Sequence, residues 1–145
     1  MEDKRKMAVD ELLSLNPIIG KKFFSAVQLP REDRLVNRGQ FFILVELQRN
    51  GEMRMSALAD KCNVSAQQLT SLADGLTEIG FIERFQDEKC RRSVIARLTE
   101  KGLAYIMEEH DRVLETALGR LGDISDEELD ELYRSAVSIR RILEK

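Results

Sequence analysis

The chain has few of the residues on which enzyme and metal sites depend. It contains one histidine, His110, two cysteines, Cys62 and Cys90, and no tryptophan. The spacing of the cysteines fits no zinc pattern, and two cysteines make no disulfide framework. No His-based metal cluster or Ser-His-Asp arrangement can be assembled without His110, and no glycine-rich phosphate loop occurs. The sequence therefore predicts no catalytic site, no metal and no cofactor.

Long hydrophobic runs are also absent. No apolar stretch approaches the roughly 18 residues that a membrane span requires, and the charged N-terminus leads into no signal-peptide core. Apolar residues make up 43% of the chain and charged residues 34%, as in soluble proteins rich in amphipathic helix. We expect a cytoplasmic protein without membrane contact, built as one domain or as one domain with helical extensions.

The net charge of −3 gives no overall attraction to nucleic acid. The charges are unevenly distributed, however. Five basic residues lie between Arg84 and Arg97 against two acidic ones, whereas residues 123–131 are strongly acidic. This distribution suits a protein that contacts DNA with one surface only.

Residues 56–102 have the element order of a winged helix-turn-helix. A first short helix opens at Ser56, and the stretch Ser65-Ala66-Gln67-Gln68 forms a capping box at the start of a second helix. This second helix has apolar residues at spacings of three and four and ends at Gly80. Residues 81–85 predict a strand, 86–91 a charged turn and 93–98 the returning strand. Such an arrangement places its second helix in a DNA groove.

Helices are predicted on both sides of this motif. Before it we expect a short helix over 4–14 with Met7, Leu12 and Leu13 inward, and a helix from Pro17 to about Gln28. A loop over 29–34 and a buried central helix over 39–49 should follow. After the motif, Thr99 and a capping box at Ser125 should start two long helices. Their apolar stripes exceed what one small domain can cover, so a second subunit is expected to cover them. The first stripe consists of Leu103, Ile106, Met107, His110, Leu114, Leu118 and Leu121, and the second of Leu129, Leu132, Tyr133, Ala136, Ile139 and Leu143.

The predicted fold class is mainly α with a small β-hairpin wing. Dimerisation helices over residues 1–38 and 99–145 should flank a winged helix-turn-helix core over residues 39–98.

From Gln40 to the C-terminus the chain resembles the MarR family of transcriptional regulators. The combination of Gly80-x-x-x-Arg84 with Leu98-Thr-x-Lys-Gly102 is the most specific part of the resemblance. The other matching segments are 40–47 with Asn50-Gly51, 58–61 with Val64-Ser65, 72–76 and 91–94. The family implies obligate dimers held by N- and C-terminal helices, a recognition helix in the major groove and a wing arginine in the minor groove. Many members release DNA when they bind a small aromatic compound or when a cysteine is oxidised.

Three positions depart from the family pattern. Members often have arginine where this chain has Ser71 and usually where it has Gly75, and they usually have aspartate where it has Cys90. The usual arginine and aspartate could form an ion pair that stiffens the wing, so we interpret the changes at 75 and 90 as linked. The recognition helix is poor in phosphate-binding charge, and its glycine costs about 1 kcal/mol relative to alanine. We therefore expect weak or wing-dependent DNA binding.

Candidate DNA contacts lie on the polar side of the recognition helix and in the wing. Glutamine can pair with adenine, serine and threonine with base edges or phosphate, and the family position of Arg92 implies minor-groove insertion at a projecting hairpin tip. The polar helix face has a simpler interpretation as a solvated surface. The candidates are Ser65, Gln67, Gln68, Thr70, Ser71, Arg84, Lys89, Arg91 and Arg92.

The resemblance also implies a cleft for a small aromatic effector, between the dimerising helices and the winged core. Here it would be lined by Phe23, Phe24, Phe41 and Phe42, which are equally explained as core residues. Cys90 lies beside Lys89, Arg91 and Arg92, a setting that favours thiolate and makes it a candidate redox residue. The alternative is an incidental surface cysteine, and Cys62 is expected to be a small core residue.

The leading hypothesis is a homodimeric repressor that binds double-stranded DNA at a pseudo-palindromic operator and is released by a small ligand. The alternative is a winged-helix protein-interaction module with weak or no DNA binding.

Overall fold

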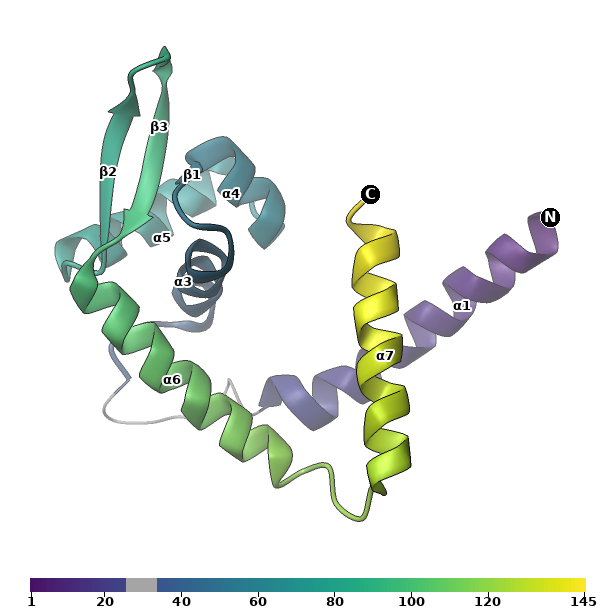
Figure 1. Cartoon of the computed structure of the whole chain (residues 1–145). Coiled ribbons are helices and arrows are strands. Elements are labelled where there is room, and N and C mark those ends of the chain that lie inside the picture. Colours follow the sequence, from purple (N-terminus) through teal and green to yellow (C-terminus); the bar gives the residue numbers. More distant parts are fainter. Residues whose placement is uncertain (26–33) are drawn as a thin grey trace.

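The computed structural model describes residues 1–25 and 34–145. It is mainly helical, with a small antiparallel sheet of strand order β1-β3-β2. The elements are α1 (Glu2–Ile19), the π-helical turn η1 (Gly20–Phe24), α3 (Arg38–Asn50), β1 (Met53–Arg54), α4 (Met55–Cys62), α5 (Ala66–Glu78), β2 (Ile82–Asp87), β3 (Cys90–Leu98), α6 (Glu100–Leu118) and α7 (Asp126–Leu143). Figure 1 shows a winged core of α3 to β3, from which α6 leads to α7. The predicted loop at 29–33 and the helix end at 26–28 lie outside the described residues.

Helix α3 forms the centre of the core, as predicted. Asn37 caps it through a capping box with Gln40, in which each side chain binds the other residue's backbone amide. Its buried residues are Phe41, Ile43, Leu44, Val45 and Leu47. Residues from every other element of the winged core except β1 join them in one buried cluster, including Leu58, Leu69, Leu76, Phe81 and Ala96. Because α3 is covered by several elements, its sequence is apolar nearly all round.

The helix-turn-helix also agrees with the prediction. Helix α4 begins one residue earlier than expected, and Asn63 ends it in the left-handed conformation with a φ of 52°. The capping box at the start of α5 is present: the Ser65 amide donates to Gln68 Oε1 over 3.0 Å, and the Gln68 amide donates to Ser65 Oγ over 3.1 Å. Gly80, with a φ of 79°, makes the turn from α5 into the wing.

The wing differs from the prediction in its turn. Strand β2 continues to Asp87 and β3 already begins at Cys90, so the turn consists of Glu88 and Lys89 rather than residues 86–91. The Asp87 carboxylate accepts a hydrogen bond from the Lys89 amide over 3.0 Å, which closes the short turn. A charged composition alone does not distinguish a turn from an exposed wing strand. The short strand β1, which pairs with β3, was not predicted because two residues carry no periodicity.

The expected helix start at Asn16-Pro17 is wrong. Helix α1 runs through Pro17 to Ile19 and continues as η1. Proline has a helical φ, so a helix can contain it at the loss of one backbone hydrogen bond. The Gly20 amide still donates to backbone carbonyls of this turn. At the far end, the side chain of Arg120 donates to Ser25 Oγ and so joins the end of α6 to the residue that follows η1.

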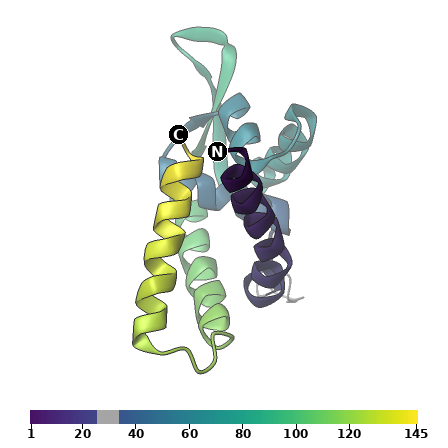
Figure 2. The same cartoon turned by 90° about the vertical axis from the view of Figure 1, so that its right-hand side faces the viewer.

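The predicted inward face of the first helix is not covered by the described residues, 1–25 and 34–145. None of the residues of α1 is buried, and Met7 is 70% exposed. Helix α7 likewise buries none of its residues, and Tyr133 is 71% exposed. Figures 1 and 2 show that both helices lie next to each other on one side of the molecule, outside the winged core. No helix in residues 1–25 and 34–145 is long and apolar enough to cross a bilayer.

Candidate nucleic-acid interface

Helix α5 presents a polar face to solvent. Ser65, Gln67, Gln68, Thr70 and Ser71 are all exposed. Ser65 and Gln68 are engaged in the capping box, and Thr70 Oγ1 donates to the Ala66 carbonyl over 2.9 Å. These bonds fix the first two turns of α5, and every predicted residue of this helix is accessible.

A concavity of about 370 Å³ lies between this helix, the start of α4 and the wing. Its basic lining is formed by Arg54, Arg84 and Arg92, and Thr70 contributes from α5. The remaining lining residues are Met55, Ser56, Ser93 and Val94. Three of the predicted DNA-contact residues therefore meet in one groove, together with Arg54, which was not among the predicted residues. The only sequence signal for Arg54 is its position directly before the first motif helix, where a capping side chain is usual; the structure shows no side-chain cap there.

The recognition helix and the wing are joined by an ion pair. Nη2 of Arg84 on β2 lies 2.6 Å from Oδ1 of Asp74 on α5. The family resemblance implies arginine and aspartate at positions 75 and 90, where this chain has Gly75 and Cys90. The pair seen here also joins the helix to the wing but has the opposite polarity, because the acid, Asp74, is on α5 and the arginine, Arg84, is on β2.

Gly75 has a packing role that the sequence did not show. A Cβ on residue 75 would lie 2.5 Å from Nε2 of Gln40. That amide nitrogen donates to the Leu72 carbonyl over 3.3 Å, and Gln40 Oε1 accepts from the Asn37 amide over 3.0 Å. Glycine thus leaves room for a side chain that connects the start of α3 with the recognition helix.

A second ion pair holds the tip of the wing. Nε and Nη2 of Arg54 donate to Oδ2 of Asp87 over 3.0 and 2.8 Å. Asp87 is only 8% exposed. The hydrogen bond from the Lys89 amide and those from Arg54 lower the pKa of Asp87, so the carboxylate is charged at neutral pH.

The other basic residues of the wing are accessible. Lys89 lies in the turn, whereas Arg91 and Arg92 are exposed on β3 and not at the tip as predicted. Arg97, lower on β3, lies over the Phe85 ring at 4.7 Å and pairs with Glu83 at 3.1 Å. Arg97 therefore belongs to the base of the wing.

The pKa of Cys90 is lowered, which is the direction predicted from the sequence, but the main cause is different. Hydrogen bonds from the Ser93 hydroxyl and the Arg92 backbone lower it most, and the charge of Arg54 adds to them. The expected causes were the neighbouring charges of Lys89, Arg91 and Arg92. In Cys62, burial and the charge of Glu46 raise the pKa to about 11, which fits an unreactive packing residue.

Three of the four candidate ligand residues, Phe24, Phe41 and Phe42, form an aromatic cluster at α3. The ring centroids of Phe24 and Phe42 lie 6.3 Å apart, and those of Phe41 and Phe42 lie 5.8 Å apart, both edge to face. The Arg38 guanidinium lies 5.5 Å from the rings of Phe24 and Phe42. Phe41 is buried and Phe23 is half-buried. The Phe42 ring thus contacts the rings of both Phe24 and Phe41, and Arg38 lies over Phe24 and Phe42.

The Leu98-Thr-x-Lys-Gly102 motif attaches α6 to the end of the recognition helix. Three consecutive carbonyls accept hydrogen bonds from it: Ile79 from Lys101 Nζ at 2.8 Å, Gly80 from Thr99 Oγ1 at 2.6 Å, and Phe81 from the Thr99 amide at 3.0 Å. A Cβ on Gly102 would lie 2.0 Å from the Phe81 carbonyl oxygen. The motif therefore couples α5 rigidly to the helix that leads to α7.

Comparisons with known proteins agree with this architecture. Residues 36–94 match the sequence model of the MarR family. The chain is similar to the uncharacterized HTH-type transcriptional regulator YfiV of Bacillus subtilis, with 30% identity over 105 residues, 72% of this chain and 66% of that protein. It is also similar to the HTH-type transcriptional repressor MdtR of Bacillus subtilis, with 26% identity over 99 residues, 66% of this chain and 64% of that protein. The matched part spans just under two thirds of the length of either relative.

Solved structures show the same fold over nearly the whole chain. A MarR family protein from Bacillus stearothermophilus has a TM-score of 0.74 at 22% identity, covering 100% of this chain and 99% of that chain. BpsR of Bordetella bronchiseptica, whose DNA binding is regulated by 6-hydroxynicotinic acid, has a TM-score of 0.66 at 16% identity, covering 91% of this chain and 99% of that chain. The predicted fold class, a mainly helical winged helix-turn-helix protein, is thereby confirmed.

Proposed function

The chain belongs to the MarR family, and we propose that it is a DNA-binding transcriptional regulator that acts as a homodimeric repressor on a pseudo-palindromic operator. The relatives are transcriptional regulators, which agrees with the prediction that the chain is not an enzyme. One of them carries the name of a repressor, which supports this direction of control. Such a protein acts where the chromosome is, so we place it in the cytoplasm.

One observation carries the proposal: the arginine-lined groove beside the exposed polar face of α5. A net charge of −3 argues against general attraction to DNA, but contacts with DNA depend on local charge. In the proposed complex α5 enters the major groove, with Gln67 and Thr70 at base edges. Arg92 reaches the adjacent minor groove, and Arg84, Lys89 and Arg91 lie near the phosphates. Ser65, Gln68 and Ser71 are at the same face.

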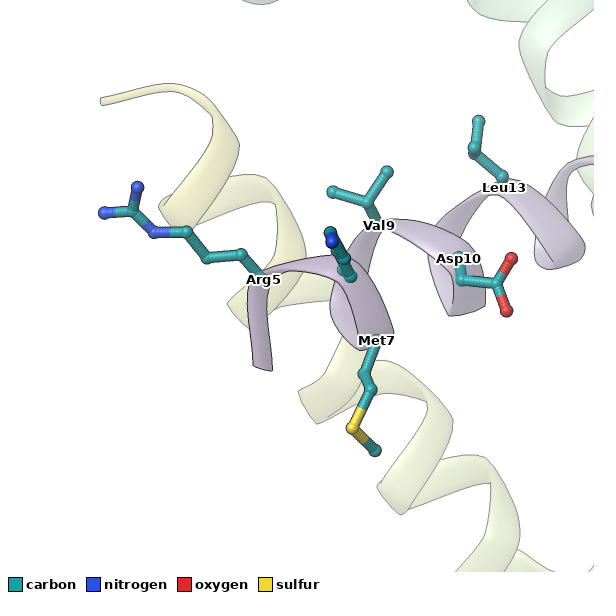
Figure 3. Close-up of a pocket in the computed structure, with 6 residues that line it drawn as sticks. Arg5, Met7, Val9, Asp10 and Leu13 are labelled. Carbon is teal, nitrogen blue, oxygen red and sulfur yellow. The ribbon is translucent and has the colours of Figure 1, made fainter. Parts of the chain in front are cut away.

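We assign dimerisation to residues 1–38 and 99–145. Large apolar side chains of α1, α6 and α7 are exposed in the single chain, among them Met7, Leu13, Leu118 and Leu143. On α1 itself, Val9 and Leu13 project from one side of the helix and Met7 from the opposite side, and all three are exposed (Figure 3). A second copy that covers these surfaces would remove them from water, which is the main stabilising contribution in obligate dimers.

Relief of repression by a small aromatic compound is the finer part of the proposal. It is supported by the aromatic cluster of Phe24, Phe41 and Phe42, next to the half-buried Phe23, and by the regulation of BpsR by 6-hydroxynicotinic acid. Aromatic carboxylic acids at millimolar concentration should raise the melting temperature and weaken DNA binding. If neither changes, this part of the proposal is wrong, and repression itself is unaffected.

Selection of binding sites from a random duplex library tests DNA recognition and defines the operator in the same experiment. Successive rounds should enrich two half-sites centred about 10 bp apart, because the two recognition helices of a two-fold dimer enter successive major grooves about 34 Å apart. The affinity for the selected site should fall with salt, with a log-log slope of about −0.9 per phosphate neutralised. If no sequence is enriched and random duplex shows no salt-dependent binding, the protein-interaction module is the better assignment.

A further inference from the structure

Arg54 connects the foot of the wing with its tip. Its backbone lies in β1, where it pairs with Ile95 of β3. Its guanidinium extends to Asp87, the last residue of β2, and both of its hydrogen bonds go to the same carboxylate oxygen. The other oxygen of Asp87 accepts the Lys89 amide in the hairpin turn. Strand β1 is therefore connected to the hairpin turn through the Arg54–Asp87 ion pair.

The register of the hairpin changes at this ion pair. Arg84 to Gln86 follow a regular antiparallel register with Ala96 to Val94, but the next residue, Asp87, is opposite Cys90. Residues 91–93 of β3 have no counterpart on β2 and form a bulge. Bulges redirect the side chains they carry, and this one carries Arg91 and Arg92. The bulge that carries Arg92 therefore begins next to the residue pair at which Arg54 binds Asp87.

Arg54 and Arg92 line the same groove together with Thr70 of the recognition helix. Without the ion pair, the positive charges of Arg54 and Arg92 at this groove would repel each other. The bulge would also lose its side-chain connection to Arg54 of β1. The neighbouring ion pair, Asp74 with Arg84, fixes the lower part of β2 only. The position of the wing beyond Gln86 therefore depends on the contacts of Asp87.

We propose that Arg54 and Asp87 are positioning residues of the DNA-binding surface: their ion pair holds the bulge at residues 91–93 and sets where Arg92 lies beside the recognition helix. The proposal rests on the proposed DNA-binding function. It assigns a role to an acidic residue of the wing, which simple charge reasoning would treat as unfavourable for DNA binding.

Whether Asp87→Asn strengthens or weakens DNA binding distinguishes a positioning role from a simple effect of charge. Removing a negative charge near DNA should strengthen binding if only Coulomb attraction matters. It should also strengthen binding if Arg54 itself contacts phosphate, because the substitution releases Arg54. Positioning predicts the opposite, since the asparagine side chain can still accept a hydrogen bond from the Lys89 amide but no longer holds the guanidinium.

The experiment compares Arg54→Gln, Asp87→Asn, the double variant and Arg54→Lys with the wild-type dimer. Arg97→Gln is the matched control, because Arg97 is also an arginine of the sheet in an ion pair, but with Glu83 at the base of the wing. Binding to the selected site is measured by fluorescence anisotropy, with A·T and G·C flanks. Amide hydrogen exchange of residues 88–94 is measured in the absence of DNA.

Arg54→Gln and Asp87→Asn should each weaken operator binding by about tenfold, the loss of one well-placed contact, and reduce the preference for A·T flanks. The double variant should be no worse than either single variant, and Arg54→Lys should recover part of the affinity. Exchange of residues 88–94 should be faster in both single variants and unchanged in Arg97→Gln.

Tighter binding by Asp87→Asn, or additive losses in the double variant, would overturn the proposal. If the wild-type protein binds no duplex, the proposed function fails. The exchange data then still decide about positioning, because unchanged exchange at 88–94 in both variants would show that the ion pair does not hold the bulge.

Discussion

Gln40 and Gly75 lie so close that the glycine cannot carry a side chain without moving the glutamine. A Cβ on residue 75 would be 2.5 Å from Gln40 Nε2. The same side chain bonds the Asn37 amide and the Leu72 carbonyl. Glycine at residue 75 thus leaves room for the position that the Gln40 side chain has in this structure.

Gly75→Ala should therefore have opposite effects in two backgrounds. Alone, it should lower the free energy of unfolding by about 1 kcal/mol, because the lost hydrogen bonds of Gln40 outweigh the gain in helix propensity. In a Gln40→Ala background it should raise the free energy of unfolding by about 0.5–1 kcal/mol. Urea unfolding at fixed protein concentration measures both. A stabilising Gly75→Ala in the wild-type background would mean that Gln40 moves aside at no cost.

Gly102→Ala should be far more damaging. The added Cβ would lie 2.0 Å from the Phe81 carbonyl oxygen, which is backbone and cannot rotate away. We expect a loss of about 3 kcal/mol or more, at the upper end for single substitutions. Gly119→Ala is the control, because its Cβ would have ordinary contacts of 3.6 Å and its φ is −61°. Thermal unfolding compares the two, and equal melting temperatures would contradict the tight attachment of α6.

Gln67→Ala and Arg92→Ala should weaken DNA binding in different ways. Gln67→Ala should cost about 1–3 kcal/mol on the operator and little on random duplex, since it removes a contact to a base. Arg92→Ala should weaken binding to the operator and to random duplex alike. It should also lower the slope of log affinity against log salt by about one per subunit and reduce the preference for flanking A·T. We expect the wing variant to be the more damaging, because the recognition helix has Ser71 and Gly75 in place of arginines. Wild-type affinity in Arg92→Ala would show that the wing does not have this role.

Dimerisation should be obligate, with an interface above about 2,000 Å² in total. Sedimentation equilibrium should give a dimer at micromolar concentration. Leu132→Asp, on the exposed stripe of α7, should yield a monomer or an unfolded chain, because it places a charge in the interface. The control is Glu131→Gln, next to it on the exposed helix. A folded wild-type monomer at micromolar concentration would refute the assignment of α1, α6 and α7.

Cys90 should react faster than Cys62 with iodoacetamide at neutral pH. The lowered pKa of Cys90 increases its thiolate fraction, whereas the pKa of Cys62, raised to about 11, leaves that thiol protonated. Ser93→Ala should slow the reaction of Cys90 with iodoacetamide, because the hydrogen bond from the Ser93 hydroxyl is the main cause of the lowered pKa of Cys90. Mass spectrometry of the labelled peptides gives both rates. If peroxide releases the wild-type protein and Cys90→Ser equally from DNA, or releases neither, Cys90 is not a redox sensor.

The sequence by itself determined the elements that depend on local interactions. The capping boxes at Ser65 and Ser125 and the cap at Thr99 require only neighbouring residues, and the structure has all of them. The apolar spacing in residues 39–49 likewise indicated the buried central helix. The polar face of α5 and the basic wing, hence the candidate DNA surface, follow from the same local patterns.

Tertiary structure decided what depends on distant partners. Arg54 and Asp87 are far apart in sequence, so neither their ion pair nor the two-residue turn and bulge that it accompanies could be derived from local composition. The close approach of Gln40 to Gly75 has the same origin. The path of α1 through Pro17 was undetermined, because Asn-Pro is compatible with a helix start and with a continuing helix. Local sequence fixes φ and ψ preferences and exposure patterns, whereas the register of the wing and the contacts of these side chains are set only when the elements pack.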